Sequence, residues 1–259
     1  MKQRIITATI ALLVFLPFVI YGNWPFVSFI YILASIGLFE LLRMKKITVI
    51  SFPTIVAMIA LWVLLLPKSI KLPIESTDII VLFVILMLSY SVLKKNKFTF
   101  QDVGFVVLST IYVTMGFFYF IETRLDGLSQ IFYVLFVVWA TDTGAYFVGR
   151  AFGKNKLWPE ISPNKTIEGA FGGILIATVV GVIFHIVYPF PYSIIMVLCI
   201  TVLISIFGQI GDLVESAYKR HFNVKDSGTL LPGHGGILDR FDSLLFVFPI
   251  LHLFQSLFL

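Results

Sequence analysis

The sequence predicts an all-α, polytopic integral membrane protein with about nine transmembrane helices in a single membrane domain, 1–259. Hydrophobic residues make up 59% of the chain, which contains 27 Phe, and the mean hydropathy is +0.99. A soluble domain of this length needs a largely polar surface, which this composition cannot supply. The apolar residues also fall in runs close to the ~20 residues that a helix needs to cross a bilayer. These observations exclude a soluble globular protein.

The expected spans follow one another with short polar connections. They cover roughly 5–22, 24–42, 47–66, 79–93, 103–121, 129–149, 167–187, 193–211 and 241–259. The first run resembles a signal peptide, but no small-x-small cleavage site follows it, and Gly22-Asn23-Trp24-Pro25 indicates a tight turn into a second helix. We expect a membrane helix there. Motifs are sparse in the helices of 1–128 and dense in 129–259, where we expect catalytic helices and cytoplasmic loops.

The distribution of Lys and Arg predicts the sidedness of these spans. With the N-terminus in the cytoplasm, nine spans leave only three basic residues outside: Lys68, Lys71 and Arg124. The other sixteen basic residues fall on the cytoplasmic side. Membrane proteins usually carry such an excess of Lys and Arg in their cytoplasmic loops, so the charges support this orientation of the spans. The C-terminus is then outside, and nearly all the unusual polar residues face the cytoplasm. In a bacterium this membrane would be the plasma membrane.

Composition also excludes several kinds of site. Cys199 is the single cysteine and lies in an apolar run, so an internal disulfide and a cysteine-based metal site are excluded. The formal charge of +5 does not indicate nucleic acid, because the basic residues flank apolar spans in short clusters. They are typical of contacts with anionic headgroups of membrane lipids.

Two segments are candidates for chemistry: one at the cytoplasmic end of the sixth span and one in the loop that follows it. Asp142 lies in WATDTGAYFVGR, and a carboxylate inside a membrane is a functional candidate unless it forms a structural ion pair with a nearby base. In ISPNKTIEGAFGG, Ser162 followed by Pro163 predicts an N-cap and the first residue of the next helix. A helix N-terminus beside Lys165 would suit a phosphate. The glycines Gly169, Gly172 and Gly173 more simply predict close helix packing.

The stretch 211–243 carries five acidic residues, four Lys or Arg and two His in a chain with only 13% charged residues. If the eighth span continues as a helix past Gly211, one of its faces carries carboxylates, a hydroxyl and an ammonium group. The members of this face are Asp212, Glu215, Ser216 and Lys219. The glycines and proline of SGTLLPGHGG then permit a sharp turn near a ligand, before Asp239 and Asp242 begin the last helix.

Carboxylates mixed with Lys and Arg suit a substrate with several phosphates and a hard cation. Mg²⁺ prefers oxygen ligands from one or two carboxylates, water and phosphate, and a second cation is compatible with the acidic residues present. Phosphoryl or nucleotidyl transfer uses such groups to position phosphates and neutralise charge. His234 in the glycine-rich loop suits an acid, base or ligand role. Glu40, at the inner end of the second span, is expected only to pair with Arg43 or Lys95.

At these residues the chain resembles the phosphatidate cytidylyltransferases, also called CDP-diacylglycerol synthases. The family signature S-x-x-K-R-x4-K-D-x-G-x2-L-P-G-H-G-G-x-x-D-R-x-D is filled without a gap from Ser216 to Asp242. DTGAYFVGR and SPNKTIEG also match, so the motif-level resemblance covers about 140–243. At Asn164 many members carry Lys, so no phosphate role is expected there.

The resemblance implies transfer of CMP from CTP to phosphatidate, giving CDP-diacylglycerol and pyrophosphate, with Mg²⁺ required. It implies catalytic roles for Lys219, Arg220, Lys225, His234 and Arg240. Substrate binding is expected at Ser162, Lys165, Thr166, Glu168, Ser216, Gly233, Gly235 and Gly236. The expected metal carboxylates are Asp212 and Asp239, followed by Asp242 and Asp142. Glycine-rich helix faces permit a homodimer.

Other membrane proteins share part of this pattern. A polyprenol or phytol kinase, or a cytidylyltransferase for an ether-lipid phosphate, would need the same metal and phosphate residues with a different lipid cleft. An ion-coupled transporter also uses membrane carboxylates. It does not need so many bases and glycines in one cytoplasmic loop.

Overall fold

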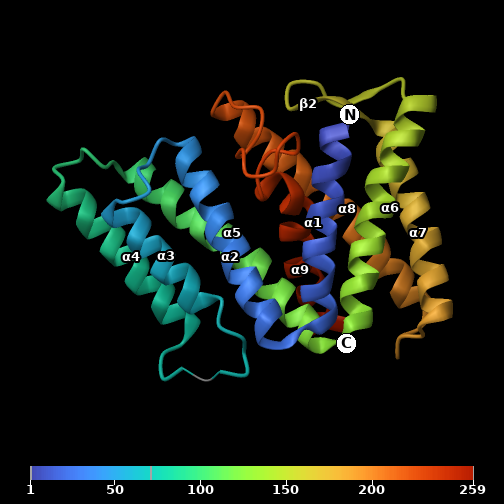
Figure 1. Cartoon of the computed structure of the whole chain (residues 1–259), viewed down its shortest axis with the longest axis horizontal. Helices are drawn as coiled ribbons and strands as arrows, with labels where there is room; N and C mark the ends of the chain where they lie inside the picture. Colours follow the sequence, from blue (N-terminus) through green and yellow to red (C-terminus); the bar gives the residue numbers. More distant parts are fainter. Residues whose placement is uncertain (1, 71, 259) are drawn as a thin grey trace. The chain divides into compact units, whose positions relative to one another are not determined.

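The computed structural model of the chain describes residues 2–70 and 72–258. Within them, nine α-helices each overlap one expected span, and a short two-stranded hairpin follows the sixth (Figure 1). The helices are α1 Lys2–Tyr21, α2 Asn23–Met44, α3 Phe52–Leu64, α4 Ser76–Leu93, α5 Phe100–Asp126, α6 Leu128–Phe152, α7 Ile167–Val187, α8 Ile194–His221 and α9 Leu238–Phe258. The strands are β1 Lys156–Trp158 and β2 Ser162–Thr166.

Seven of these helices, α2 and α4–α9, are long and apolar enough to cross a membrane. The apolar part of α1, Ile5–Tyr21, and the whole of α3 are shorter. The predicted helical membrane protein is therefore confirmed. Nine crossings and the sidedness of the two termini remain predictions.

The described chain forms two compact units. The first unit contains the residues up to Glu122 together with Asp226–Asp239, and the second contains Thr123–Lys225 with the residues from Arg240 onward. The loop that carries the PGHGG motif therefore packs with the N-terminal helices, although it lies among the C-terminal motifs in the sequence. The expected single domain remains a prediction.

The first unit is built from α1–α5. Phe26 of α2 packs edge-on against Phe120 of α5, with ring centroids 5.5 Å apart, and both side chains are fully buried. The ammonium group of Lys45 lies 2.8 Å from the carboxylate of Asp102, and this ion pair joins the end of α2 to the start of α5.

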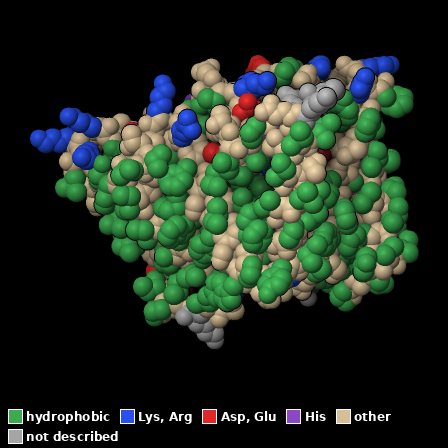
Figure 2. Space-filling model, viewed as in Figure 1, with side chains coloured by type: hydrophobic (Ala, Val, Ile, Leu, Met, Phe, Trp, Pro, Cys, Tyr) green, Lys and Arg blue, Asp and Glu red, His purple; other side chains and the backbone are tan. Residues whose placement is uncertain are grey.

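The surface of α3–α5 lies at the left of Figure 2. Hydrophobic side chains cover the sides of these helices, and Lys and Arg side chains gather at one end. This distribution suits contact with lipid.

The second unit is built around α6, α7 and α8, which pack against one another. A Cβ added to Gly173 of α7 would lie 2.7 Å from the carbonyl oxygen of Thr141 in α6, so only glycine allows this approach. The Thr141 hydroxyl donates to Ser205 of α8 at 2.9 Å. Close packing of small residues was the simpler explanation for the glycines of α7, and at Gly173 the contact distances agree with it.

The start of α7 differs from the expectation at Ser162. Ser162 does not cap a helix: it lies in β2, opposite Trp158 of β1 in an antiparallel pair. Thr166 is the N-cap instead, and its hydroxyl accepts a hydrogen bond from the Gly169 N–H at 3.1 Å. Pro163 is tolerated in β2 because a strand at the edge of a sheet does not need every N–H. The amides at the start of α7 therefore follow Lys165 directly.

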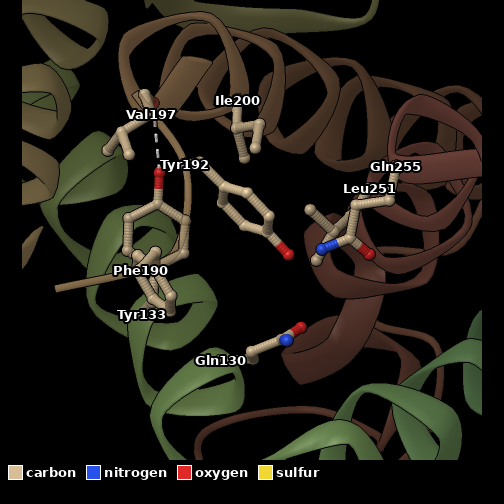
Figure 3. A pocket seen from close by; sticks show the side chains of 8 residues that line it. All are labelled: Gln130, Tyr133, Phe190, Tyr192, Val197, Ile200, Leu251 and Gln255. Atoms are coloured by element: carbon tan, nitrogen blue, oxygen red, sulfur yellow. Dashed lines mark hydrogen bonds between the residues drawn. The ribbon is translucent and has the colours of Figure 1, made fainter. Parts of the chain in front are cut away.

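A cavity of about 20 Å³ lies in the second unit between the starts of α6 and α8 and the end of α9 (Figure 3). Gln130 and Tyr133 of α6 line it, and the Tyr133 hydroxyl donates to the Val197 carbonyl at 3.3 Å. Asp142 lies twelve residues after Gln130 on the same helix, a rise of about 18 Å. This cavity is therefore separate from the motif residues.

Candidate functional site

An acidic and basic cluster forms at the junction of β2 and α8 in the second unit. The Lys165 ammonium lies 2.7 Å from the Asp212 carboxylate, and both side chains are partly exposed. Ser216, one turn further along α8, donates to the other oxygen of Asp212 at 3.3 Å. Both oxygens of this carboxylate are thus held by groups that the sequence motifs contain.

Two more carboxylates of the second unit are close enough to interact with this cluster. Asp142 of α6 is within electrostatic range of Asp212, Lys165 and Arg240. Asp242 of α9 is within range of both Asp142 and Asp212. Residues of α6, α8 and α9 thus place three carboxylates within electrostatic range of one another.

Two basic side chains of α8, Lys219 and Arg220, contact other groups of the second unit. Lys219 pairs with the buried carboxylate of Glu215, one turn earlier on the helix. Arg220 donates from Nε to the carbonyl oxygen of Ile161 at 3.3 Å, which joins the end of α8 to the hairpin. Lys225 is exposed. These contacts do not test the predicted roles of Lys219, Arg220 and Lys225 in binding phosphate.

Glu168 lies in the first turn of α7 and braces the preceding loop. Its carboxylate accepts hydrogen bonds from the backbone N–H of Asn155, at 3.1 Å, and from its side-chain amide, at 2.8 Å. The negative charge also complements the positive end of the helix. A contribution to the shape of the hairpin is therefore the role that these contacts support.

The loop 226–239 is held in the first unit by Asp239 and Ser227. One oxygen of the Asp239 carboxylate accepts from the Ser227 N–H at 2.7 Å, the Ser227 hydroxyl at 2.8 Å and the Gly236 N–H at 2.8 Å. Gly233 and Gly235 adopt φ of 76° and 81°, in the left-handed region that favours glycine. A Cβ at Gly235 would also collide with Asp239. The glycines are thus required by the turn and by the approach of this carboxylate.

Glu40 of α2 contacts the same loop from the N-terminal part of the chain. Its carboxylate accepts from the N–H groups of Ile237 and Leu238 and from the Ser227 hydroxyl, each at 2.9 Å. The side chain is only 6% exposed. A buried N–H left without an acceptor costs about 1–3 kcal/mol, so Glu40 contributes to the stability of this turn.

His234 occupies the tip of the loop. Its backbone N–H donates to the carbonyl oxygen of Leu231 at 2.8 Å. Its Nδ1 is buried and has no hydrogen-bond partner among the described residues. This nitrogen is therefore available for a hydrogen bond, and the acid, base or ligand role of His234 remains a prediction.

The carboxylates of the second unit suit a hard cation. In the described part of the chain, no three His, Cys, Asp or Glu side chains form a ready-made cage. Mg²⁺ does not need one, because it commonly takes one or two carboxylates and completes its shell with water and phosphate oxygens. Asp142, Asp212 and Asp242 supply oxygen ligands of the right kind. The residues present therefore fit Mg²⁺.

Comparison with known proteins identifies the family. Residues 2–258 match the model of the cytidylyltransferase family. The chain belongs to this family. It is 55% identical to the phosphatidate cytidylyltransferase of Bacillus subtilis (strain 168), over 100% of this chain and 98% of that protein. It is 50% identical to the protein of the same name from Staphylococcus haemolyticus (strain JCSC1435), with 98% of each chain covered.

Membership in the cytidylyltransferase family makes the chain a nucleotidyltransferase and confirms the resemblance that the signature carries. The long apolar helices and the bacterial relatives together support an integral protein of the plasma membrane. The side on which its site lies remains a prediction.

The main residues that sequence reasoning missed are Glu40 and Ser227. Glu40 was expected to pair with Arg43 or Lys95, but its carboxylate accepts hydrogen bonds from groups of the loop 226–239. Ser227 stands inside the signature at a position that the pattern leaves open. A signal was present for Glu40, because a carboxylate near a helix end in an apolar span is costly without several donors.

Proposed function

We propose that the chain is a phosphatidate cytidylyltransferase, which transfers CMP from CTP to phosphatidate and releases pyrophosphate. The observation that carries the proposal is the gap-free signature from Ser216 to Asp242, in a chain that relatives of that name match along its full length. The cluster of Asp142, Lys165 and Asp212 supplies the mixed charges that such a reaction uses.

In the proposed reaction, a phosphate oxygen of phosphatidate attacks the α-phosphorus of CTP. The bond from that phosphorus to the oxygen bridging the α- and β-phosphates breaks, and pyrophosphate leaves. A phosphate monoester is largely ionised near neutral pH, so the attacking oxygen needs no strong base from the protein. Catalysis then rests on positioning and on neutralising the charge of the phosphates.

Different residues of the chain would position the phosphates and neutralise their charge. Cationic side chains of the second unit would hold phosphate oxygens, with Arg able to bind two at once. These are Lys165, Lys219, Arg220, Lys225 and Arg240. The glycine-rich turn would offer backbone N–H groups, and the predicted ligand His234 lies at its tip. Ser162 and Thr166, which lie in β2, are proposed to contribute to substrate binding beside Lys165.

Asp142, Asp212 and Asp242 would hold Mg²⁺, and Asp239 is proposed as a further ligand on the family resemblance. Bound Mg²⁺ neutralises phosphate charge and aligns the triphosphate for displacement. A second cation and a homodimer remain predictions. We further propose that the site faces the cytoplasm, because CTP arrives from there and sixteen of nineteen basic residues fall on that side under the expected topology.

The substrate is tested by giving the purified protein Mg²⁺, CTP and one lipid at a time. We expect pyrophosphate release with phosphatidate and little with an ether-lipid phosphate, a polyprenol or phytol. Comparable release with the ether-lipid phosphate would move the assignment to that substrate. Formation of CDP with a polyprenol or phytol would instead identify a CTP-dependent kinase.

A further inference from the structure

Glu40 stands outside every sequence motif described above, yet it contacts residues near both ends of the loop 226–239. It lies near the C-terminal end of α2, which is otherwise composed mainly of apolar residues. Its carboxylate is 187 residues from Ser227 in the sequence, and 197 and 198 residues from Ile237 and Leu238. A buried carboxylate with three donors is a costly feature that an ordinary membrane helix does not need.

Two of the three groups that donate to Glu40 are the backbone N–H groups of Ile237 and Leu238, at the start of α9. Helix α9 begins at Leu238, and the first N–H groups of a helix have no partner within the helix. Glu40 accepts from Ile237 and Leu238, while side chains of the loop itself accept from the neighbouring positions Gly236 and Asp239. Glu40 therefore caps α9 from a different helix, where its negative charge also meets the positive end of the helix dipole.

The glycines of the signature are matched to this carboxylate. A Cβ at Gly228 would lie 2.5 Å from Glu40 Oε1 and 2.9 Å from its Cδ, and a Cβ at Gly236 would collide with the same oxygen. On α2, Gly37 lies one turn before Glu40 and leaves room for the side chain of Leu238, whose nearest atom would be 3.2 Å from an added Cβ. Both surfaces are thus shaped for the insertion of Glu40 into the loop.

A second contact ties the loop to the N-terminal helices. The hydroxyl of Thr7 in α1 donates to the carbonyl oxygen of Pro232 at 3.0 Å. Pro232 opens the PGHGG turn, whereas Glu40 holds the residues that close it. The two ends of the turn are therefore each held by a different N-terminal helix.

We propose that Glu40 is a positioning residue for the reaction: it fixes the PGHGG turn in the conformation that binds the phosphates of CTP. This inference rests on the proposed function for its substrate, and on the contacts above for its geometry. Under this proposal the N-terminal helices, in which motifs are sparse, support catalysis by holding the PGHGG turn. Glu40 itself acts only through the loop and touches no substrate.

The test compares Glu40→Gln with Glu122→Gln, a matched control in the same unit. Glu122 of α5 is also a buried carboxylate, and it accepts from the backbone N–H of Lys68 rather than from the loop 226–239. Gln at position 40 places an amide NH₂ among backbone donors that Glu40 now accepts. In hydrogen–deuterium exchange, we expect the peptide containing Gly236–Leu238 to exchange at least tenfold faster in Glu40→Gln and at the wild-type rate in the control.

Kinetics separate positioning from a general loss of stability. We expect Glu40→Gln to raise the KM for CTP at least tenfold, with the KM for phosphatidate within twofold of wild type and partial recovery of the CTP value in Glu40→Asp. Glu122→Gln should leave both KM values unchanged. Wild-type exchange at Gly236–Leu238, or a wild-type KM for CTP, in a folded Glu40→Gln protein would overturn the proposal.

A second pair of variants covers the case in which Glu40→Gln does not fold. Gly228→Ala presses a methyl group against Glu40, whereas Gly104→Ala of α5 meets no atom within 4 Å. Faster loop exchange and a higher KM for CTP in Gly228→Ala only would support the proposal, and equal behaviour of the two would refute it. If wild-type protein makes no CDP-diacylglycerol, the proposed function fails, but the exchange experiment still decides whether Glu40 holds the loop.

Discussion

Substitution of Gly211 by Ala tests whether the acidic cluster depends on the close approach of α8 and α9. A Cβ at Gly211 would lie 2.6 Å from the carbonyl oxygen of Asp242 and 3.1 Å from the Cα of Ser243. Ordinary van der Waals contact begins at 3.4 Å, so the helices must separate by about 0.8 Å. Asp212 follows Gly211 directly, and the shift therefore moves its carboxylate away from Asp242.

Two opposing effects set the size of the change in stability. Ala is favoured over Gly inside a helix by about 1 kcal/mol. Overpacking against atoms that cannot yield costs about 1–3 kcal/mol. We therefore expect the free energy of unfolding to fall by at most about 2 kcal/mol. A displacement near 1 Å in a reacting site costs about 100-fold in rate, so kcat should fall by about two orders of magnitude.

Gly208→Ala is the matched control, because its Cβ would meet Val247 at 3.5 Å, an ordinary contact. Both variants are purified in detergent and compared by thermal unfolding and by CMP transfer from CTP to phosphatidate. We expect kcat within twofold of wild type for Gly208→Ala. A near-wild-type kcat for Gly211→Ala would show that activity does not depend on the spacing of α8 and α9 at this point.

Three further predictions concern the same unit. Asp212→Asn should reduce CMP transfer from labelled CTP at least 100-fold, while membrane fractionation should show unchanged insertion. Activity above a tenth of wild type would remove Asp212 from the proposed Mg²⁺ site. Chelation of divalent cations should abolish transfer and added Mg²⁺ should restore it, whereas full activity in the chelator would contradict the need for Mg²⁺. Thr166→Ala should lower the free energy of unfolding by about 1 kcal/mol because it removes the N-cap of α7, whereas Thr166→Ser should leave it unchanged. Equal thermal stability of the two variants would contradict a stabilising role of the Thr166 hydroxyl as the N-cap.

The residues that sequence reasoning placed well are those governed by local spacing. Asp212, Ser216 and Lys219 were expected on one face of a helix, and α8 does continue to His221. Asp242 was expected near the start of the last helix, and α9 begins at Leu238. Helical periodicity is a short-range property, so a few residues suffice to predict it.

The errors arose where contacts outside the local helical pattern decide the structure. Ser162 carries a capping signal, but pairing with β1 extends the chain to Thr166, which caps α7 with the same chemistry. Glu40 has bases nearby in the sequence, but the backbone N–H groups that donate to it lie almost two hundred residues away. The apolar span around Glu40 indicates that its carboxylate needs several donors, but no local pattern identifies the distant groups that supply them.

The central claim is that the lipid phosphate attacks the α-phosphorus of CTP. It is tested most directly by supplying the protein, in liposomes with phosphatidate and Mg²⁺, with CTP labelled at either the α- or the γ-phosphate. The account predicts that only the α-label enters the lipid, with one pyrophosphate released for each lipid labelled. Transfer of the γ-label to lipid, or absence of lipid label from both forms of CTP, would contradict it.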